Sequence, residues 1–347
     1  MALNIVSSKR LKDLFWFAVA TGIFVFLIQM ADPAKILSAF RDANLFYVFL
    51  SVLSGFGVLL AWTLNWRNFF QVSDISCSFP RTFQLFSAGQ FLNSVTPLGQ
   101  FGGQPFMAYL ISKHSDTSYE KSLATVMSAD VLAIIPLSTF VILGYSYITI
   151  TGTVSGELTR MSIIASSLLL FGIVMSYLGW YRPGSLEKSL LTASEKVTSF
   201  IGRGSTFVEK LEEKLENVED TFQTVGKNPR AIMKSLAITH TAFLLKMSAF
   251  YAVLASLGVE MNIFQVMLLI PLASVANFSP TPGGTGTFEA AMAGLIILFI
   301  NINLATALTA AILYRISTYW LGILVGYVSM SSLNYSTKNL KNMHKER

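Results

Sequence analysis

The stretch "NFSPTPGGTGTFEAAMAGLIILFI", residues 277–300, joins a cluster of helix-breaking residues directly to a long apolar run. Inside a bilayer, irregular chain is tolerated only where it is buried in protein or lines a water-filled cavity, because its amides find no other partners. Proline removes a backbone donor, and glycine permits positive φ. The segment therefore predicts a tight turn over 280–286 that ends one half-helix and begins another at about Thr285.

The composition of the whole chain indicates a protein that crosses the membrane several times. The 347 residues are 53% hydrophobic and 13% charged, and they include 27 Phe. A soluble protein carries about 25% charged residues. Six apolar runs reach the ~20 residues that a crossing needs. We predict an all-α polytopic membrane protein with full transmembrane helices at 13–30, 45–66, 124–150, 160–181, 234–257 and 304–331.

Two further apolar regions, 82–112 and 263–300, are each interrupted by prolines and glycines. The interruptions are "NSVTPLGQFGGQP" (93–105) and "NFSPTPGGTG" (277–286). In the first region, the apolar pieces on either side are too short to cross a bilayer alone. We predict that each region is a Pro/Gly-broken re-entrant hairpin, which returns to the side of the membrane from which it enters. The alternative is that each region crosses once.

The basic residues favour the hairpins. With the N-terminus in the cytoplasm, two hairpins place most of the 25 Lys and Arg on the cytoplasmic side, as the positive-inside rule requires. Single crossings would instead move 182–234, with its many Lys and Arg, to the outside. Long segments translocate largely regardless of charge, so the alternative stays open. We expect a multi-pass protein of the plasma membrane with both termini in the cytoplasm.

The two interruptions resemble each other, which indicates an inverted repeat. In both, a proline lies seven residues before a polar side chain, glycines fill the interval, and an asparagine precedes the proline. The residues concerned are Asn93, Pro97, Gly99, Gly102, Gly103 and Gln104 in the first region and Asn277, Pro282, Gly283, Gly284, Gly286 and Glu289 in the second. Corresponding broken helices in two inverted halves point to the central site of a transporter.

This interpretation divides the chain into four parts. An N-terminal membrane half, 1–181, contains the first hairpin, and a C-terminal membrane half, 234–331, contains the second. Between them, 182–233 places apolar residues every three or four positions among Glu and Lys, which predicts an amphipathic cytoplasmic helix as a linker. A coiled-coil seam is the other interpretation of this stripe. A basic cytoplasmic tail, 332–347, follows.

Four ionisable residues lie within the predicted membrane segments, namely Asp130, Lys246, Glu289 and Arg315. A charge at the bilayer centre costs about 2.5–3.5 kcal/mol on the insertion scale, so such residues are functional candidates by default. We predict that Arg315 pairs with Glu289. The other interpretation is that Glu289 only complements the dipole of its half-helix. For Lys246, the other interpretation is that its side chain extends to the membrane interface.

The predicted substrate-binding or transport site lies at the two interruptions. The N-terminal amides of the half-helix at Thr285 suit an anionic group such as a carboxylate or phosphate. Gln104 either orients polar groups of the substrate or bonds to a neighbouring helix. The full set of predicted site residues is Asn93, Pro97, Gly103, Gln104, Asp130, Lys246, Asn277, Pro282, Gly283, Gly284, Gly286, Glu289 and Arg315.

Other classes of site find no support in the sequence. Cys77 is the lone cysteine and the three histidines are scattered, so we expect no metal site and no cofactor. The polar residues of the predicted spans form no convergent acid–base set, so we expect no enzymatic activity and no catalytic residues. The net charge of +6 fits the basic cytoplasmic loops of a membrane protein, so we do not expect nucleic-acid binding.

The segments "PGGTGTFE" (282–289) and "YR" (314–315) resemble the second signature of the lysylphosphatidylglycerol synthase transmembrane region, also called the flippase-like membrane family. The segment "TPLGQFGGQPFMAYL" (96–110) is similar to the first signature, which usually reads Gly-Glu-x-x-Arg near its end. Here Gln104 and Met107 stand in place of that Glu and that Arg. A mechanism that needs matched charges in both halves is therefore not expected for this chain.

The resemblance extends over most of the chain, from about residue 10 to residue 330. It implies a helical membrane bundle with a role in moving or presenting charged or glycosylated lipids across the bilayer. No synthase domain follows residue 331, so we do not expect aminoacyl transfer.

We expect a flippase-like or translocase-like protein that moves or presents a lipid with an anionic or glycosylated headgroup. The sequence contains no nucleotide-binding G-x-x-x-x-G-K-[ST] motif, so we expect movement without ATP. The alternatives are a secondary transporter of a small soluble solute, a helper subunit without transport activity and a membrane-embedded enzyme. Expected partners are membrane lipids, with a lipid-modifying enzyme or glycosyltransferase and a second copy of the chain as further candidates.

Overall fold

The computed structural model describes residues 18–19, 21–95, 99–115, 117–151, 224 and 226–333. Within these residues all regular elements are helices, which confirms the all-α prediction for this part of the chain. The parts of the predictions that lie outside the described residues are the span 160–181, nearly all of the linker 182–233, the tail from residue 334 and Pro97.

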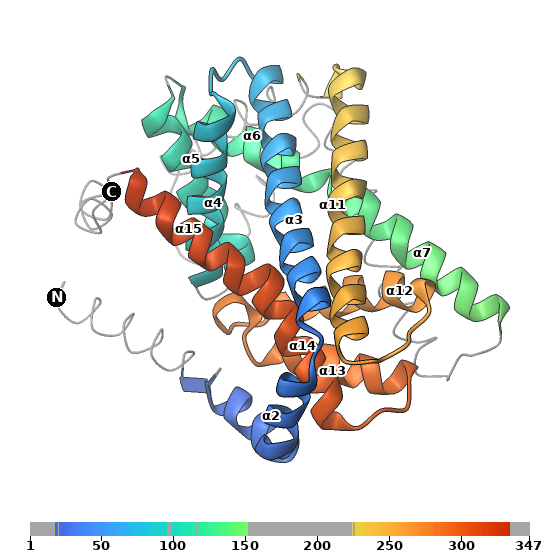
Figure 1. Ribbon diagram of the computed structural model, residues 1–347. Coiled ribbons are helices and arrows are strands. Elements are labelled where there is room, and N and C mark those ends of the chain that lie inside the picture. The colour runs from blue at the N-terminus through green and yellow to red at the C-terminus, as the bar shows by residue number, and fades with distance from the viewer. Residues whose placement is uncertain are drawn as a thin grey trace, which may run out of the picture.

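Four helices in the described part of the chain are long and apolar enough to cross a membrane (Figure 1). They are α3 (Leu45–Val72), the pair α6–α7 (Tyr119–Ile150), α11 (Pro229–Ser256) and the run α14–α15 (Leu304–Ser332). Each overlaps one predicted span. A fifth candidate is a bent pair, in which Thr21–Met30 is followed by α2 (Pro33–Asp42) at an angle of 83°. The described residues therefore hold four or five candidate spans.

Polar capping residues mark where the long helices begin. Asn44 precedes α3 and Asn228 precedes α11, and each side chain accepts a hydrogen bond from a backbone amide of the first turn. Pro229 follows at the first position of α11, where a missing amide hydrogen is harmless. Ser118 and Asn303 cap α6 and α14 in the same way. These caps satisfy amides that the helix itself leaves unpaired.

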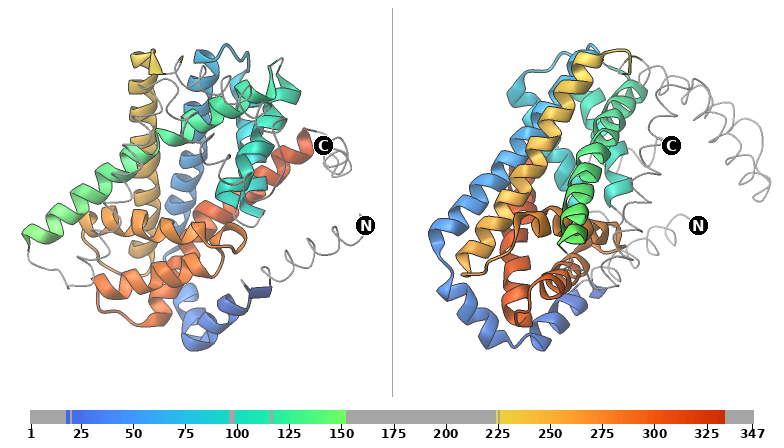
Figure 2. Two further views of the ribbon diagram at one scale, coloured as in Figure 1. Left: turned by 180° about the vertical axis from the view of Figure 1, so that it is seen from behind. Right: turned by 90° about the vertical axis from the view of Figure 1, so that its right-hand side faces the viewer.

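The helices α3 and α11 lie antiparallel and side by side in the centre of the bundle (Figures 1 and 2). At one end, Asn68 Nδ2 donates to the carbonyl oxygen of Ala231 over 2.8 Å. Further along the pair, the buried Ser235 hydroxyl donates to Asn65 Oδ1 over 2.6 Å. Such bonds between apolar helices fix their register, because a polar group without a partner is costly in this environment.

Both interrupted regions fold as two helical segments separated by a break, as predicted. The first consists of α4 (Phe79–Val95) and α5 (Gly99–His114), which pack against each other. The second consists of α12 (Ile263–Ser274), two short 3₁₀ turns, η1 (Val275–Phe278) and η2 (Pro282–Gly284), and α13 (Thr287–Phe299). We call these the first hairpin and the second hairpin.

The two hairpins approach each other from opposite ends of the bundle. The first hairpin lies toward the end at which α3 finishes and α11 begins, and the second lies toward the other end (Figures 1 and 2). The turn η2 contacts both α4 and α5. In addition, the hydroxyl of Tyr319 donates to the carbonyl oxygen of Ser94, at the end of α4, over 3.1 Å. The broken tips are therefore in contact inside the protein.

The last span has a wider turn in its middle. It consists of α14 (Leu304–Arg315), a π turn, η3 (Ile316–Trp320), and α15 (Leu321–Ser332). Such single π turns hold one extra residue and are frequent at functional sites. Gly55 of α3 lies so close to the carbonyl oxygen of Ser317 that a Cβ would overlap it. Beyond the π turn, Gly326 packs closely against Phe91 of α4.

The span predicted at 124–150 contains a break. The structure divides it into α6 (Tyr119–Val131) and α7 (Ile134–Ile150), with Leu132 and Ala133 between them. Hydropathy did not indicate this break, because all four residues from Val131 to Ile134 are apolar or small.

The helices of the two halves begin at a regular spacing. The helices α3, α4 and α6 begin at residues 45, 79 and 119, and α11, α12 and α14 begin at residues 229, 263 and 304. The later helix follows the earlier one by 184 or 185 residues in all three pairs. This spacing holds across long helices, breaks and loops alike.

Large apolar side chains cover much of the outer surface of the bundle. Phe26, Phe49, Leu53, Leu324 and Val328 are each more than half exposed. A soluble protein avoids exposing so many large apolar groups, whereas lipid chains solvate them. The surface therefore agrees with an integral membrane protein.

Candidate functional site

The second hairpin is broken by a loop in which three glycines hold positive φ. The φ angles are 57° at Gly283, 69° at Gly284 and 84° at Gly286, in a region that other residues rarely adopt. At Gly283 the ring of Tyr319 occupies the place that a Cβ would take. The loop agrees with the tight turn predicted over 280–286, and α13 begins at Thr287.

Two other predicted residues shape the same loop. Pro282 begins the short turn η2, where its fixed φ and missing amide hydrogen suit a first helical position. Asn277 lies in η1 and packs against Gly284, where a Cβ would come within 2.9 Å of the Asn277 Cα. The chain therefore passes close to itself across the break, which requires the absence of a side chain at this position.

Glu289 lies in the first turn of α13 and has partners on both carboxylate oxygens. Its Oε2 accepts a hydrogen bond of 2.7 Å from the backbone amide of Gly286, the residue before the helix. Its Oε1 accepts a hydrogen bond of 3.0 Å from Nε of Arg315. The side chain is only 2% exposed. The predicted ion pair is thus present, and the same carboxylate also caps the helix, so the two interpretations of Glu289 hold together.

Arg315, the last residue of α14, crosses from its own helix to the broken loop. Its Nη2 donates to the carbonyl oxygen of Gly283 over 2.8 Å. The guanidinium carbon lies 3.7 Å from the centre of the Tyr319 ring and 4.9 Å from that of Phe288. Buried charges are tolerated only when hydrogen bonds and opposite charges replace water, and this arrangement supplies both. The aromatic rings add cation–π attraction.

Sequence reasoning missed several residues of this site. Tyr319 lies four residues after Arg315, so the two side chains share a helix face, and this spacing was the available signal. The hydroxyl of Ser279 lies 2.7 Å from that of Thr287 and 2.8 Å from that of Thr281. The site therefore contains hydroxyl groups and backbone carbonyls beside the ion pair, all in the part of the bundle where the hairpins meet.

In the first hairpin, the structure brings Gln104 and Asp130 together. Gln104, in α5, donates from Nε2 to Oδ2 of Asp130, at the end of α6, over 2.9 Å. The two residues are 26 positions apart, the same separation as Glu289 and Arg315. Gly103 precedes Gln104 in α5. The sequence predicted both polar residues as candidates but did not predict that they meet.

The first hairpin also holds buried oxygen atoms without donors. Oε1 of Gln104 and Oδ1 of Asn93 are buried and have no hydrogen-bond partner within the described residues. Buried polar atoms are nearly always hydrogen-bonded, so an exception needs a physical explanation such as an ordered water or an ion. The first hairpin thus differs from the second, where the ion pair is fully hydrogen-bonded.

Lys246 belongs to neither cluster. Its Nζ lies 5.0 Å from the ring centre of Phe243 and 5.9 Å from that of Trp62. In the part of the chain that the structure describes, Lys246 forms no ion pair with a carboxylate. Aromatic faces attract an ammonium group, so Lys246 is held between α3 and α11 by its own helix and Trp62.

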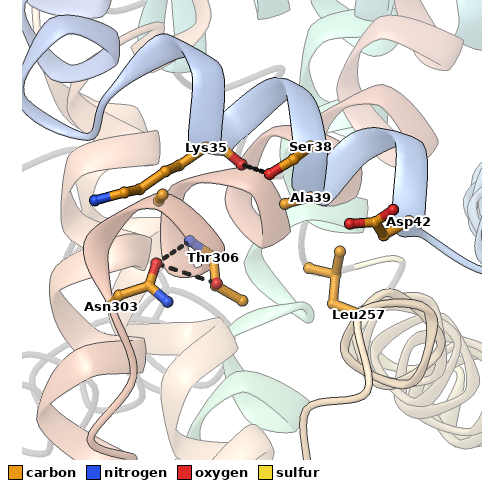
Figure 3. Close-up of a pocket in the computed structure, with 8 residues that line it drawn as sticks. Lys35, Ser38, Ala39, Asp42, Leu257, Asn303 and Thr306 are labelled. Atoms are coloured by element: carbon orange, nitrogen blue, oxygen red, sulfur yellow. Dashed lines mark hydrogen bonds between the residues drawn. The ribbon is translucent and has the colours of Figure 1, made fainter.

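Two cavities lie at opposite ends of the α3–α11 pair, and no predicted site residue lines either. The first, of about 320 Å³, lies beside α2 and the start of α14 (Figure 3). Its lining residues are Lys35, Ser38, Ala39, Asp42, Leu257, Asn303, Ala305 and Thr306. The second, of about 280 Å³, is lined by Asn68, Gln71, Val72, Asn228, Arg230, Ala231 and Lys234. Both are polar and lie where the helices end, which is where a bilayer has its headgroups.

Among the residues that the structure describes, no three His, Cys, Asp or Glu side chains cluster in a way that suits a transition metal. The residues that have chemical potential are therefore the ion pair of the second hairpin and the carboxylate–amide pair of the first. Both pairs can bind or release polar groups inside an apolar bundle.

Comparisons with known proteins agree with this architecture. A UPF0104 membrane protein of Pyrococcus horikoshii, PH1989, is 27% identical over 325 residues, which cover 91% of this chain and 96% of the relative. A UPF0104 membrane protein of Methanothermobacter thermautotrophicus is 25% identical over 312 residues, or 85% of this chain and 88% of the relative. A third, MJ1595 of Methanocaldococcus jannaschii, is 25% identical over 308 residues, or 85% and 87%.

The sequence profile of one family covers nearly the whole chain. This profile, described as the lysylphosphatidylglycerol synthase TM region, matches residues 14–326, which include both hairpins, the Glu289–Arg315 pair and the four long helices. The chain belongs to the lysylphosphatidylglycerol synthase transmembrane-region family.

Proposed function

We propose that this protein is an ATP-independent flippase or translocase for a lipid with an anionic or glycosylated headgroup. The observation that carries the proposal is the buried Glu289–Arg315 pair at the broken tip of one hairpin, in contact through Tyr319 with the tip of the other. Charged residues inside membrane bundles mark pathways for polar substrates. The family, whose name refers to the membrane region of a lipid synthase, gives the substrate class.

The proposal includes an inverted repeat, with the first hairpin and its flanking spans in one half and the second in the other. Three observations support the repeat. Equivalent helices begin 184 or 185 residues apart. The contacts Gln104–Asp130 and Glu289–Arg315 both join residues 26 positions apart. The hairpins also reach the centre from opposite ends of the bundle (Figure 2). Inverted repeats with broken helices form the substrate path of many transporters.

In this mechanism the headgroup moves along the hairpin tips while the acyl chains remain in lipid. The glycine loop exposes backbone groups, and the start of α13 offers a positive dipole end to an anionic headgroup. Passage requires the tips to separate, which breaks the Tyr319–Ser94 bond and frees hydrogen-bonding groups around Arg315. We further propose a plasma-membrane location with cytoplasmic termini, no enzymatic step, and a lipid-modifying enzyme or a second copy of the chain as partner.

The test is lipid movement in proteoliposomes with labelled anionic, zwitterionic and glycosylated lipids. We expect the wild type to move one class and the variants Glu289→Gln and Arg315→Met to lose that movement while they remain folded. The matched controls are Glu260→Gln and Arg41→Met, which change an exposed carboxylate and an exposed guanidinium by the same chemistry. Full movement in both folded site variants would place the pair outside the transport path.

A secondary transporter of a small soluble solute remains the second candidate, favoured by the two polar cavities of about 320 and 280 Å³. The same proteoliposomes separate the candidates. If no lipid moves but a soluble anion or sugar enters, and Glu289→Gln abolishes its entry, the solute transporter is correct.

A further inference from the structure

The two hairpins contain equivalent pairs of opposite electrical character. In the second hairpin, the negative Glu289 meets the positive Arg315, so the pair is neutral. In the first hairpin, at the same separation of 26 residues, a neutral amide, Gln104, meets a carboxylate, Asp130. Asp130 forms no ion pair with Lys, Arg or His in the described part of the chain. The first hairpin therefore has an unbalanced negative charge where the second has none.

The basic residues on the neighbouring helices lie away from Asp130. Lys121 and Lys113 are each nine residues from the pair along α6 and α5, or roughly 13 Å at 1.5 Å per residue. Arg67 lies two residues beyond Asn65, which donates to Ala129, so Arg67 points to the other side of α3. There its guanidinium lies 6.0 Å from the centre of the Phe79 ring. The remaining charged residues of these helices, Arg81, His114 and Glu120, lie near the helix ends that are remote from the hairpin tip.

Oxygen atoms without donors surround the same carboxylate. Because Gln104 donates its amide hydrogen to Asp130, its Oε1 is left as an acceptor, and this atom is buried without a partner. Asn93 Oδ1 is likewise buried without a partner. An ionised carboxylate only accepts. These side chains therefore offer acceptors in excess, and what they lack is a positive group.

The register of the hairpin places Asn93 at the level of Gln104. Gly89 of α4 packs against Met107 of α5, where a Cβ on Gly89 would come within 3.1 Å of the Met107 methyl carbon. Asn93 lies four residues from Gly89 toward the tip, and Gln104 lies three residues from Met107 in the same direction. Residues three or four apart share a helix face. Both amides therefore lie one turn above the same contact, on the faces that the two helices present to each other.

We propose that the first hairpin binds a monovalent metal cation, Na⁺, between the Asp130 carboxylate and the amide oxygens of Gln104 and Asn93. All three candidate ligands are hard oxygen atoms, which suit alkali and alkaline-earth ions rather than transition metals. One carboxylate balances one positive charge, which selects a monovalent ion. The two amide oxygens are buried, so a bare ion reaches them and a bulky lipid headgroup does not.

Binding of the cation would connect three helices. Asn93 is on α4, Gln104 on α5 and Asp130 on α6, one residue before α6 ends. In the absence of the ion, the carboxylate keeps a single amide donor, and the two amide oxygens keep none. The site therefore ties the first hairpin to the following span only when the ion is present, which is how transporters couple ion binding to movement of a broken helix. This coupling role rests on the proposed transport function, whereas the binding site does not.

The test measures thermal unfolding of the purified full-length protein in detergent, without lipid transport. The unfolding temperature is followed against NaCl concentration, with N-methylglucamine chloride keeping the ionic strength constant and KCl as a second series. We expect a saturable rise with Na⁺ in the wild type and in Glu260→Gln, and no rise in Asp130→Asn. An equal rise with N-methylglucamine, or a full Na⁺ response in folded Asp130→Asn, would overturn the site.

A second variant covers the case in which Asp130→Asn does not fold. Gln104→Met keeps the length of the side chain and removes the oxygen, so we expect a Na⁺ response shifted to about tenfold higher concentration, the lower end of the loss seen when groups around a metal ion are changed. An unshifted response would exclude Gln104 as a ligand and overturn the proposed site. A stability that responds to pH but not to Na⁺ would show that a proton balances Asp130 instead. If Na⁺ binds but no lipid moves, the transport proposal fails and the cation site stands.

Discussion

The hydroxyl of Tyr319, one turn after Arg315, donates a 3.1 Å hydrogen bond to the carbonyl oxygen of Ser94 at the end of α4. The same ring lies 3.7 Å from the Arg315 guanidinium. One side chain therefore touches the ion pair of the second hairpin with its face and the first hairpin with its hydroxyl. The two broken tips are joined through Tyr319, and most of the predictions below change this junction or the pairs beside it.

The variant Tyr319→Phe isolates the hydrogen bond between the tips. It removes the hydroxyl and keeps the ring over Arg315, so we expect a loss of about 0.5–1.5 kcal/mol in stability with the fold retained. The measurement is the unfolding temperature in detergent. Tyr327→Phe is the control, because Tyr327 is 59% exposed and its ring packs on Phe91. If Tyr319→Phe has no effect while Tyr319→Ala is strongly destabilising, the ring alone is responsible and the junction is not a hydrogen bond.

Breaking the Glu289–Arg315 pair from one side leaves a buried charge without its partner. We expect Glu289→Gln and Arg315→Met each to cost about 3–5 kcal/mol, and the double variant to cost clearly less than their sum. A double-mutant cycle of unfolding temperatures or of chemical unfolding provides the coupling. Arg315→Lys serves as a third variant, and we expect it to be nearly as damaging as Arg315→Met, because an ammonium cannot reach both Glu289 and Gly283 while it stacks on Tyr319. Additive effects would indicate that the two charges do not interact.

Gly283→Ala tests the glycine loop. The substitution forces a side chain into positive φ and into the Tyr319 ring at once, so we expect destabilisation of at least ~1–3 kcal/mol. Gly294→Ala in α13 is the matched control, because a Cβ at Gly294 meets nothing within 4 Å. There we expect a gain of about 0.5–1 kcal/mol from the better helix former. Equal effects at the two positions in an unfolding assay would contradict the described loop geometry.

Exchanging the polar pair of the first hairpin tests the equivalence of the two halves. The double variant Gln104→Glu with Asp130→Arg places in the first hairpin the same residue types as in the second. We expect it to fold and to unfold at a temperature that no longer depends on Na⁺, since its positive charge is now built in. Each single variant introduces an unmatched charge and is expected to be less stable than the double variant. A double variant less stable than both singles would show that the two sites are not equivalent.

Lys246→Met separates stability from transport. Lys246 has only aromatic contacts, so its removal relieves about 2.5–3.5 kcal/mol of membrane insertion cost and loses roughly 1–2 kcal/mol of cation–π attraction. We expect a small net rise in unfolding temperature. If lipid movement falls at the same time, Lys246 acts in transport, and if movement is unchanged it is a structural contact. A marked loss of stability would contradict the expected balance of these two terms.

Much of the second hairpin could be predicted from the sequence, because its constraints are severe. Proline and glycine at membrane depth have few allowed structures, and a buried Glu289 requires a positive partner, for which Arg315 was the nearest candidate in its half. The contact between Gln104 and Asp130 could not be predicted in this way. A neutral amide accepts many partners, so no charge rule selects one.

Helix ends and breaks were predicted less well than the apolar runs. The span predicted at 45–66 continues to Val72, because hydropathy detects the apolar part of a helix and not its polar last turns, which here include Arg67, Asn68 and Gln71. The bend after Met30 follows from Asp32 and Pro33, a cap and a first-turn proline that end one helix and begin another. The π turn left no comparable signal, since it depends on how α3 approaches Ser317.

The extra residue in the π turn Ile316–Trp320 sets the helical phase of the last span. One added residue rotates everything beyond it by roughly 100° relative to a continuous α-helix. Arg315, before the turn, faces the second hairpin, and Gly326, after it, faces α4 of the first. A single rod thus presents two contact surfaces whose angular offset is stored in five residues. Shortening this turn by one residue would keep the span continuous and apolar, yet it would turn one of the two surfaces away from its hairpin.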